Sequence, residues 1–145
     1  MKKCLHPAWW LPLLGLLAGC VTNDQEFERP FWARMSTAQL LYYEHSQNEV
    51  LIDFSLNSRA TVALNPEVAK SVLLINDVPV AESHAIFLNR EQDEQWTRLE
   101  PHCGLFFRRS LTGFFENAGR YRVVWQGPAF ESSPLVIDVR PHPRP

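Results

Sequence analysis

The sequence predicts an all-β protein, folded as a single antiparallel β-sandwich of about seven strands over residues 38–140. Short apolar stretches recur along this segment, and turn-forming residues separate them at intervals of roughly eight to twelve residues. Within several stretches apolar and polar residues alternate, which is typical of a strand with one buried face. No convincing long helical pattern interrupts the series. These observations favour two packed sheets.

The first strands are predicted between residues 39 and 64. A strand over 39–45 is favoured, although Ser36-Thr37-Ala38-Gln39 has the form of a capping box that opens a short helix. The stretch 50–56 carries an apolar residue at every second position, which indicates a half-buried strand. A third short strand is predicted over 60–64.

A β-hairpin is predicted around Asn76-Asp77. The apolar stretches 72–75 and 78–80 flank this pair, and both residue types tolerate the left-handed backbone of a two-residue turn. Pro79 has no backbone N–H to donate to a neighbouring strand. The second arm of the hairpin is therefore expected at the edge of a sheet.

The last third of the sandwich contains the strongest strand patterns. Strands are predicted at 105–111, within 114–125, and at 135–140, where apolar and other residues alternate. The intervening segment 126–134 is rich in Gly, Ser and Pro and is expected to be a loop. The tail 141–145 contains three prolines and is expected to be extended.

The stretch Asn117-Ala118-Gly119-Arg120-Tyr121 precedes one of these strands. It resembles the tyrosine corner of immunoglobulin-like and fibronectin type III-like domains. The resemblance implies that Asn117, Gly119 and Tyr121 form a structural corner, in which the tyrosine hydroxyl bonds to the backbone just upstream. The disulfide that joins the sheets of antibody domains has no counterpart, so an antibody-type domain is excluded.

The N-terminal segment has the composition of a secretory signal. Lys2 and Lys3 precede an apolar block over 7–17, which is too short to cross a bilayer. The block ends in Leu17-Ala18-Gly19-Cys20, which resembles the lipobox of bacterial lipoprotein signal peptides. This resemblance implies that residues 1–19 are a signal peptide removed by cleavage before Cys20.

The same resemblance implies the fate and location of the remaining chain. Cys20 would carry a diacylglyceryl group on its thiol and an acyl chain, such as palmitate, on its amino group, and 20–37 would be a lipidated tether. In Gram-negative lipoproteins an Asp after the cysteine retains the protein at the inner membrane, whereas this chain has Val21. The expected location is the inner leaflet of the outer membrane, facing the periplasm.

Composition and motifs exclude several function classes. The formal net charge is −2 and charges of both signs are interspersed, so a nucleic-acid partner is not expected. No catalytic, phosphate-binding or metal-binding motif occurs, and the histidines outside the leader are scattered. No enzyme activity, cofactor or metal is therefore expected. Cys103 would be the only free thiol after processing, and we expect a buried small side chain or, alternatively, an intermolecular disulfide.

Two sets of residues are candidates for partner binding. Phe31 and Trp32 lie in the expected tether, where they either pack against the domain or dock onto a partner or the lipid interface. Arg108, Arg120 and Arg122 would form an outward basic cluster if their two strands shared one sheet. The alternative is pairing with acidic side chains on neighbouring strands, for which the candidates are Glu116, Glu131 and Asp138.

The function predicted from these features is a non-catalytic binding or scaffold module for an envelope protein complex. An alternative is an inhibitor of an envelope protease, with 90–96 and 126–133 as candidate inhibitory loops. A small-ligand carrier or an enzyme is the third hypothesis. The sequence does not predict the oligomeric state or the identity of the partner.

Overall fold

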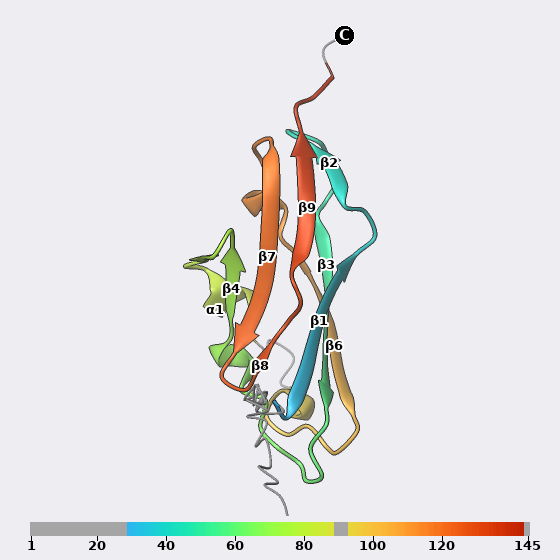
Figure 1. Ribbon diagram of the computed structural model, residues 1–145, viewed down its shortest axis with the longest axis vertical. Coiled ribbons are helices and arrows are strands. Elements are labelled where there is room, and N and C mark those ends of the chain that lie inside the picture. The colour runs from blue at the N-terminus through green and yellow to red at the C-terminus, as the bar shows by residue number, and fades with distance from the viewer. Residues whose placement is uncertain (1–28, 89–92, 144–145) are drawn as a thin grey trace, which may run out of the picture.

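The computed structural model describes residues 29–88 and 93–143. Strands of two sheets run along the long axis of the molecule (Figure 1). The expected signal peptide and the lipidation site at Cys20 lie outside the described residues, as do 89–92 and the end of the tail. The all-β sandwich predicted from the sequence is confirmed.

The first sheet has three antiparallel strands in the order β1 (Phe31–Thr37), β3 (Leu51–Ser58) and β6 (Gly104–Ser110). The second has the order β2 (Leu41–Tyr43), β9 (Leu135–Arg140), β7 (Gly119–Gly127), β4 (Val72–Ile75) and β5 (Val78–Pro79). A short strand β8 (Phe130–Glu131) also pairs with β7. Only the β2–β9 pair is parallel among these named strands.

Short helices occupy the connections. They are η1 (Val68–Lys70), α1 (Ser83–Ile86), η2 (Glu94–Trp96) and η3 (Thr112–Phe114). Helix α1 and η2 both lie in the long connection between β5 and β6. This connection therefore passes beside the first sheet without supplying it with a fourth strand in the described part of the chain.

The core forms where the inner faces of the sheets meet around Trp125. The Trp125 ring is fully buried and meets the rings of Phe54 and Phe87 at centroid distances of 5.2 and 5.7 Å. Its indole N–H donates to the buried Ser71 hydroxyl at 2.8 Å. A buried Trp requires such a partner for its one donor, so Ser71 satisfies the polar end of the largest core side chain.

Several sequence predictions are confirmed in detail. Strand β3 buries Ile52, Phe54 and Leu56 on one face, as the alternation predicted. Asn76 and Asp77 have φ values of 51° and 66°, so both residues of the predicted hairpin turn are left-handed. Strand β5, which ends at Pro79, lies at the edge of the second sheet.

The predicted tyrosine corner is also present. The Tyr121 hydroxyl donates to the backbone carbonyl of Asn117 at 2.8 Å, and Gly119 begins β7. The bond spans the entry to β7 from the other sheet, after β6 and η3. The bond therefore lies where the chain crosses between the two sheets, which is the position that the resemblance implies.

Two predictions for the N-terminal half are wrong, and one strand is confirmed over a shorter range than expected. The tether was expected to continue to residue 37, but β1 begins at Phe31 because its alternate side chains are buried in the sandwich. The strand expected over 39–45 is limited to β2, and no helix forms at the capping-box sequence. No strand forms over 60–64, where a single bridge joins Leu64 to Leu99.

Candidate functional site

The outer face of the first sheet carries an exposed aromatic ring on its edge strand β6. Phe106 of β6 is 69% exposed, the highest value among the large apolar side chains described. Cross-strand pairing places Phe106 beside Ser55 of β3, and Ser55 beside Arg34 of β1. A groove of about 630 Å³ runs over this face, with Phe106, Arg34 and Arg108 among its lining residues. Aromatic side chains are enriched at protein–protein interfaces, so this face is a candidate docking surface.

Strand β6 also has a free edge. The N–H of Leu111 donates to the carbonyl of Val50, and the N–H of Ser58 donates to the carbonyl of Cys103. These two bonds show which residues of β6 are hydrogen-bonded to β3. The backbone N–H and C=O groups of odd-numbered residues point toward β3, and those of even-numbered residues point away from it. The backbone N–H and C=O groups of Gly104 and Phe106 therefore point outward, and no described strand pairs with them.

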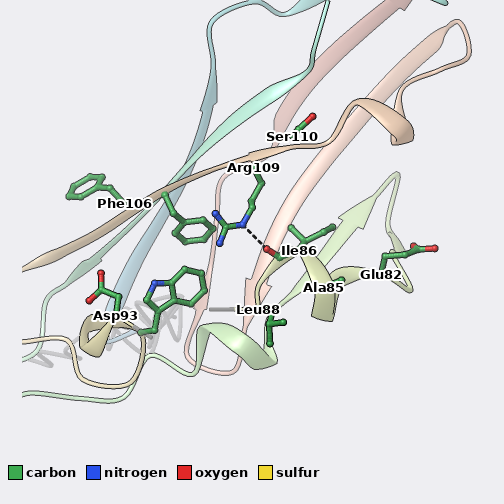
Figure 2. Close-up of a pocket in the computed structure, with 10 residues that line it drawn as sticks. Glu82, Ala85, Ile86, Leu88, Asp93, Phe106, Arg109 and Ser110 are labelled. Atoms are coloured by element: carbon green, nitrogen blue, oxygen red, sulfur yellow. Dashed lines mark hydrogen bonds between the residues drawn. The ribbon is translucent and has the colours of Figure 1, made fainter. Parts of the chain in front are cut away.

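The Arg109 side chain occupies the edge of β6 at Arg108, two residues beyond Phe106. Its Nη1 donates to the carbonyl of Arg108 at 2.8 Å, and its Nε donates to the carbonyl of Ile86, at the end of α1, at 2.9 Å. Figure 2 shows Arg109 extending toward Ile86, whereas Phe106 lies on the other side of β6. The guanidinium carbon lies 5.0 Å from the centre of the Phe107 ring and 5.7 Å from that of Trp96. A charged side chain placed in this way restricts strand pairing to the part of the edge near Phe106.

A cavity of about 470 Å³ lies between the edge of β6 and the described residues at and around α1 and η2 (Figure 2). Its lining combines apolar side chains such as Ile86, Leu88 and Trp96 with the charged side chains of Glu82 and Arg109. Phe106 contributes both to this cavity and to the groove on the outer face. The two hollows therefore meet at Phe106, where the edge of the strand is open.

One ion pair crosses the outer face beside Phe106. Arg108 donates from Nε and Nη2 to the two carboxylate oxygens of Asp53, at 2.6 and 2.9 Å. These hydrogen bonds are the main cause that lowers the pKa of Asp53, and they raise the pKa of Arg108. The pair spans β3 and β6 beside Phe106, so it reduces the net charge next to the exposed ring.

The predicted arginine cluster does not form. Arg108 lies on β6 of the first sheet, whereas Arg120 and Arg122 lie on β7 of the second sheet. The residues also have separate acidic partners: Arg120 lies 3.8 Å from Asp138, and Arg122 lies 2.6 Å from Asp77. Pairing of Arg120 with Asp138 confirms the alternative interpretation, in which these side chains pair across strands.

The other two acidic candidates do not pair with these arginines. Glu131 lies 3.4 Å from Arg29. Glu116 forms no salt bridge in the described part of the chain. The cross-strand interpretation is thus confirmed for Asp138 and wrong for Glu116 and Glu131.

Phe31 and Trp32 have different environments. Phe31 is 3% exposed and belongs to the core, because the first residue of β1 points inward. Trp32 points outward and is 46% exposed, and the Arg59 guanidinium lies 5.9 Å from the centre of its ring. Only Trp32 is therefore available for contact with another molecule.

Two further expectations are corrected. Cys103 was expected to be buried, but its thiol is exposed because it follows the left-handed residue His102 in the turn before β6. The loop 126–133 was a candidate for insertion into a protease. It instead includes the end of β7 and all of β8, and Phe130 and Ser132 are buried.

The second candidate inhibitory loop, 90–96, is described only from Asp93 onward. There η2 buries Trp96 against the Phe107 ring, with 4.7 Å between the ring centres. The Asp93 carboxylate accepts a bond from the backbone N–H of Gln95 at 3.0 Å, so it caps η2. The described part of this loop therefore packs against the domain.

The candidate site residue that the sequence did not single out is Phe106. It lies in the continuous apolar run Leu105-Phe106-Phe107, whose middle member alone points outward. Alternation within the predicted strand was the available signal, because Leu105 and Phe107 share one face. In such a run, however, alternation does not show which face is buried.

The chain has no significant similarity to any protein-family model, to any curated protein or to any solved structure. No group of three or more His, Cys, Asp or Glu side chains in the described residues is placed to hold a metal ion. Helices long and apolar enough to span a membrane are also absent from residues 29–88 and 93–143.

Proposed function

We propose that this chain is a lipid-anchored envelope protein whose immunoglobulin-like sandwich docks a partner protein without catalysis. The partner adds an extended segment to the free edge of β6. The main observation behind this proposal is the Phe106 ring, which is 69% exposed. It lies on a strand whose outward backbone groups have no partner strand among the described residues. Backbone bonds along such an edge supply affinity, and side-chain contacts supply specificity.

The edge near Phe106 has the two features that strand addition requires. The outward N–H and C=O groups of Phe106 form a hydrogen-bonding template, and the exposed ring lies beside it. Burying a Phe side chain contributes about 1.5–3 kcal/mol. Arg109 blocks the neighbouring Arg108 carbonyl, so the template is short and its register is defined. A short template next to one aromatic anchor favours a specific partner over sheet aggregation.

The envelope location is supported by the leader sequence. The stretch Leu17-Ala18-Gly19-Cys20 carries the small residues and the cysteine that lipid attachment requires, and Val21 favours the outer membrane. Stable attachment needs more than one acyl chain, and a triacylated Cys20 meets that condition. In this proposal the anchor places the domain in the periplasm, where an envelope protein supplies the extended segment.

The experiment places a photoreactive amino acid at Phe106 in the intact chain, expressed in cells. The matched control carries the same group at Val78, which is 64% exposed on β5 at the edge of the other sheet. We expect one defined protein adduct from position 106 and none of that mass from position 78. Equal adducts from both positions, or none from position 106, would contradict the proposal.

A second comparison distinguishes strand addition from contact with the ring alone. Phe106→Ala and Phe106→Pro both remove the ring, but only proline removes the outward N–H. Neither substitution breaks a bond to β3, because that N–H points away from β3. If the partner adds a strand, Phe106→Pro should bind the partner identified by crosslinking more weakly than Phe106→Ala does. An equal loss of binding in the two variants would indicate contact with the ring face only.

A further inference from the structure

The described chain starts at one end of the sandwich, so this end is the one closest in sequence to Cys20 (Figure 1). Strand β1 begins there, β3 ends there and β6 begins there (Figure 1). Backbone bonds join these segments: Arg59 donates to the Pro30 carbonyl at 2.8 Å, and Ser58 donates to the Cys103 carbonyl at 2.9 Å. The described C-terminal residues lie at the opposite end of the molecule (Figure 1). The two ends of the sandwich are therefore distinct surfaces.

This end exposes apolar and cationic side chains together. Trp32 is 46% exposed, and Val62 in the loop after β3 is 61% exposed. The Arg59 guanidinium lies 5.9 Å from the centre of the Trp32 ring. Tryptophan with a neighbouring arginine suits the boundary between lipid headgroups and acyl chains, because each combines an apolar body with a polar group.

One cation at this end, Arg59, is not offset by an acidic side chain among the described residues. Arg29 lies 3.4 Å from Glu131, and Arg98 lies 2.8 Å from Glu100, so these charges offset one another. Arg59 has no salt-bridge partner in the described part of the chain. An unpaired guanidinium binds phosphate through geometrically matched donors. Such a cation is attracted to the negative surface of an anionic membrane.

The length of the connecting chain limits how far this end can lie from a membrane. Arg29 lies nine positions after Cys20 in the sequence. A fully extended chain spans at most about 3.3–3.6 Å per residue, so the first described residue lies within about 30 Å of the acyl chains. This step rests on the lipidation of Cys20 in the proposed function. It makes the end that carries Trp32, rather than the C-terminal end, the surface nearest the lipid.

We propose that this end of the sandwich rests on the membrane surface. The Trp32 ring lies at the level of the headgroups, and the Arg59 guanidinium binds the phosphate of an anionic phospholipid. The domain is then oriented by its own surface and not only by its acyl anchor. Such a contact fixes which way the free edge of β6 faces relative to the membrane.

Tryptophan fluorescence tests this contact directly. After removal of residues 1–19 the tryptophans are Trp32, Trp96 and Trp125, and the last two are buried. The lipidated chain is reconstituted into phosphatidylglycerol–phosphatidylcholine vesicles whose acyl chains carry a bromine quencher. We expect emission that is quenched and shifted to the blue, with both effects lost in Trp32→Phe. Arg59→Gln should reduce the quenching in these vesicles, but not in vesicles of phosphatidylcholine alone.

A matched control moves the reporter to the other end. Tyr43 is exposed in β2, opposite Arg140 of β9, so Trp32→Phe combined with Tyr43→Trp keeps one exposed tryptophan. We expect no quenching from this double variant. If the chain is lipidated and bound to vesicles but Trp32 is quenched no more than the tryptophan at position 43, the inference is overturned. The lipid anchor of the proposed function would not be contradicted by that result.

Two further readouts separate the inference from the proposed function. An intact mass without acyl groups at Cys20 would contradict the anchor, and this inference with it. A photoreactive group at Trp32 that crosslinks to lipid supports the membrane contact. Crosslinks from position 32 to protein alone would assign this end to a protein partner instead and overturn the inference.

Discussion

The ring of Phe106 lies directly over Gly104. A Cβ atom placed on Gly104 would come within 2.7 Å of the Phe106 ring and of the Asn57 side-chain oxygen. The absence of a side chain at Gly104 therefore lets the exposed ring lie along its own strand, next to the open edge. The position of the ring depends on this glycine.

Gly104→Ala should move the ring with little loss of stability. The atoms in the way are the far ends of two side chains, which can rotate, so we expect a change within about 0.5 kcal/mol in the free energy of unfolding. Shifted ring resonances of Phe106 and a smaller yield of its partner adduct would accompany it. Gly113→Ala is the control because open space surrounds that position. A large loss of stability in Gly104→Ala alone would show that the ring is fixed in place.

Tyr121→Phe should destabilise the domain by about 1 kcal/mol, because it removes the hydroxyl that donates to the Asn117 carbonyl. Urea unfolding followed by fluorescence measures this difference. Tyr43→Phe is the matched control, since the Tyr43 hydroxyl forms no hydrogen bond among the described residues. Equal stability of the two variants would indicate that the corner bond does not hold the crossover between the sheets.

Ser71→Ala should cost more, about 1–3 kcal/mol, because it leaves the buried indole N–H of Trp125 without an acceptor. The measurement is again the free energy of unfolding in urea. Ser133→Ala, at an exposed position, should leave stability unchanged. A neutral Ser71→Ala would mean that another acceptor replaces the hydroxyl.

The Asp53–Arg108 pair should make stability depend on pH below the ordinary Asp pKa of 3.8. Because folding lowers the pKa of Asp53, its contribution is present above that value and is lost as the pH falls through the folded-state pKa. In Asp53→Asn the thermal unfolding midpoint should change less between about pH 5 and pH 2 than it does in the original chain, because this range spans the titration of Asp53. Arg108→Gln should flatten it similarly, and high salt should reduce the effect because the pair is exposed.

Local sequence signals predicted the elements whose patterns are self-contained. The alternation in β3 and the hairpin at Asn76-Asp77 depend on neighbouring residues, as does the corner at Tyr121. Strand β1 was missed although Phe31, Ala33 and Met35 alternate with polar or exposed residues. Its position after a polar segment and Pro30 favoured a tether, and pairing with β3 overrode that interpretation.

The candidate site depended on long-range pairing, which local patterns do not contain. The arginine cluster required β6 and β7 to share a sheet, and the chain crosses between sheets before Gly119. The open edge of β6 arises because the long connection from β5 adds no described strand there. Both facts concern which strands become neighbours. The tyrosine corner signalled a crossover but not which strand would be left at the edge.

Residue-resolved hydrogen exchange of the β6 amides tests the central claim, that this strand offers a free edge to a partner, most directly. In the isolated chain the amide of Phe106, which points outward, should exchange rapidly, whereas that of Phe107, which faces β3, should be protected. When the original chain is bound to the partner identified by the crosslinking experiment, the amide of Phe106 should become protected. A Phe106 amide already protected in the isolated chain, or one that exchanges equally fast with the partner bound, would contradict the account.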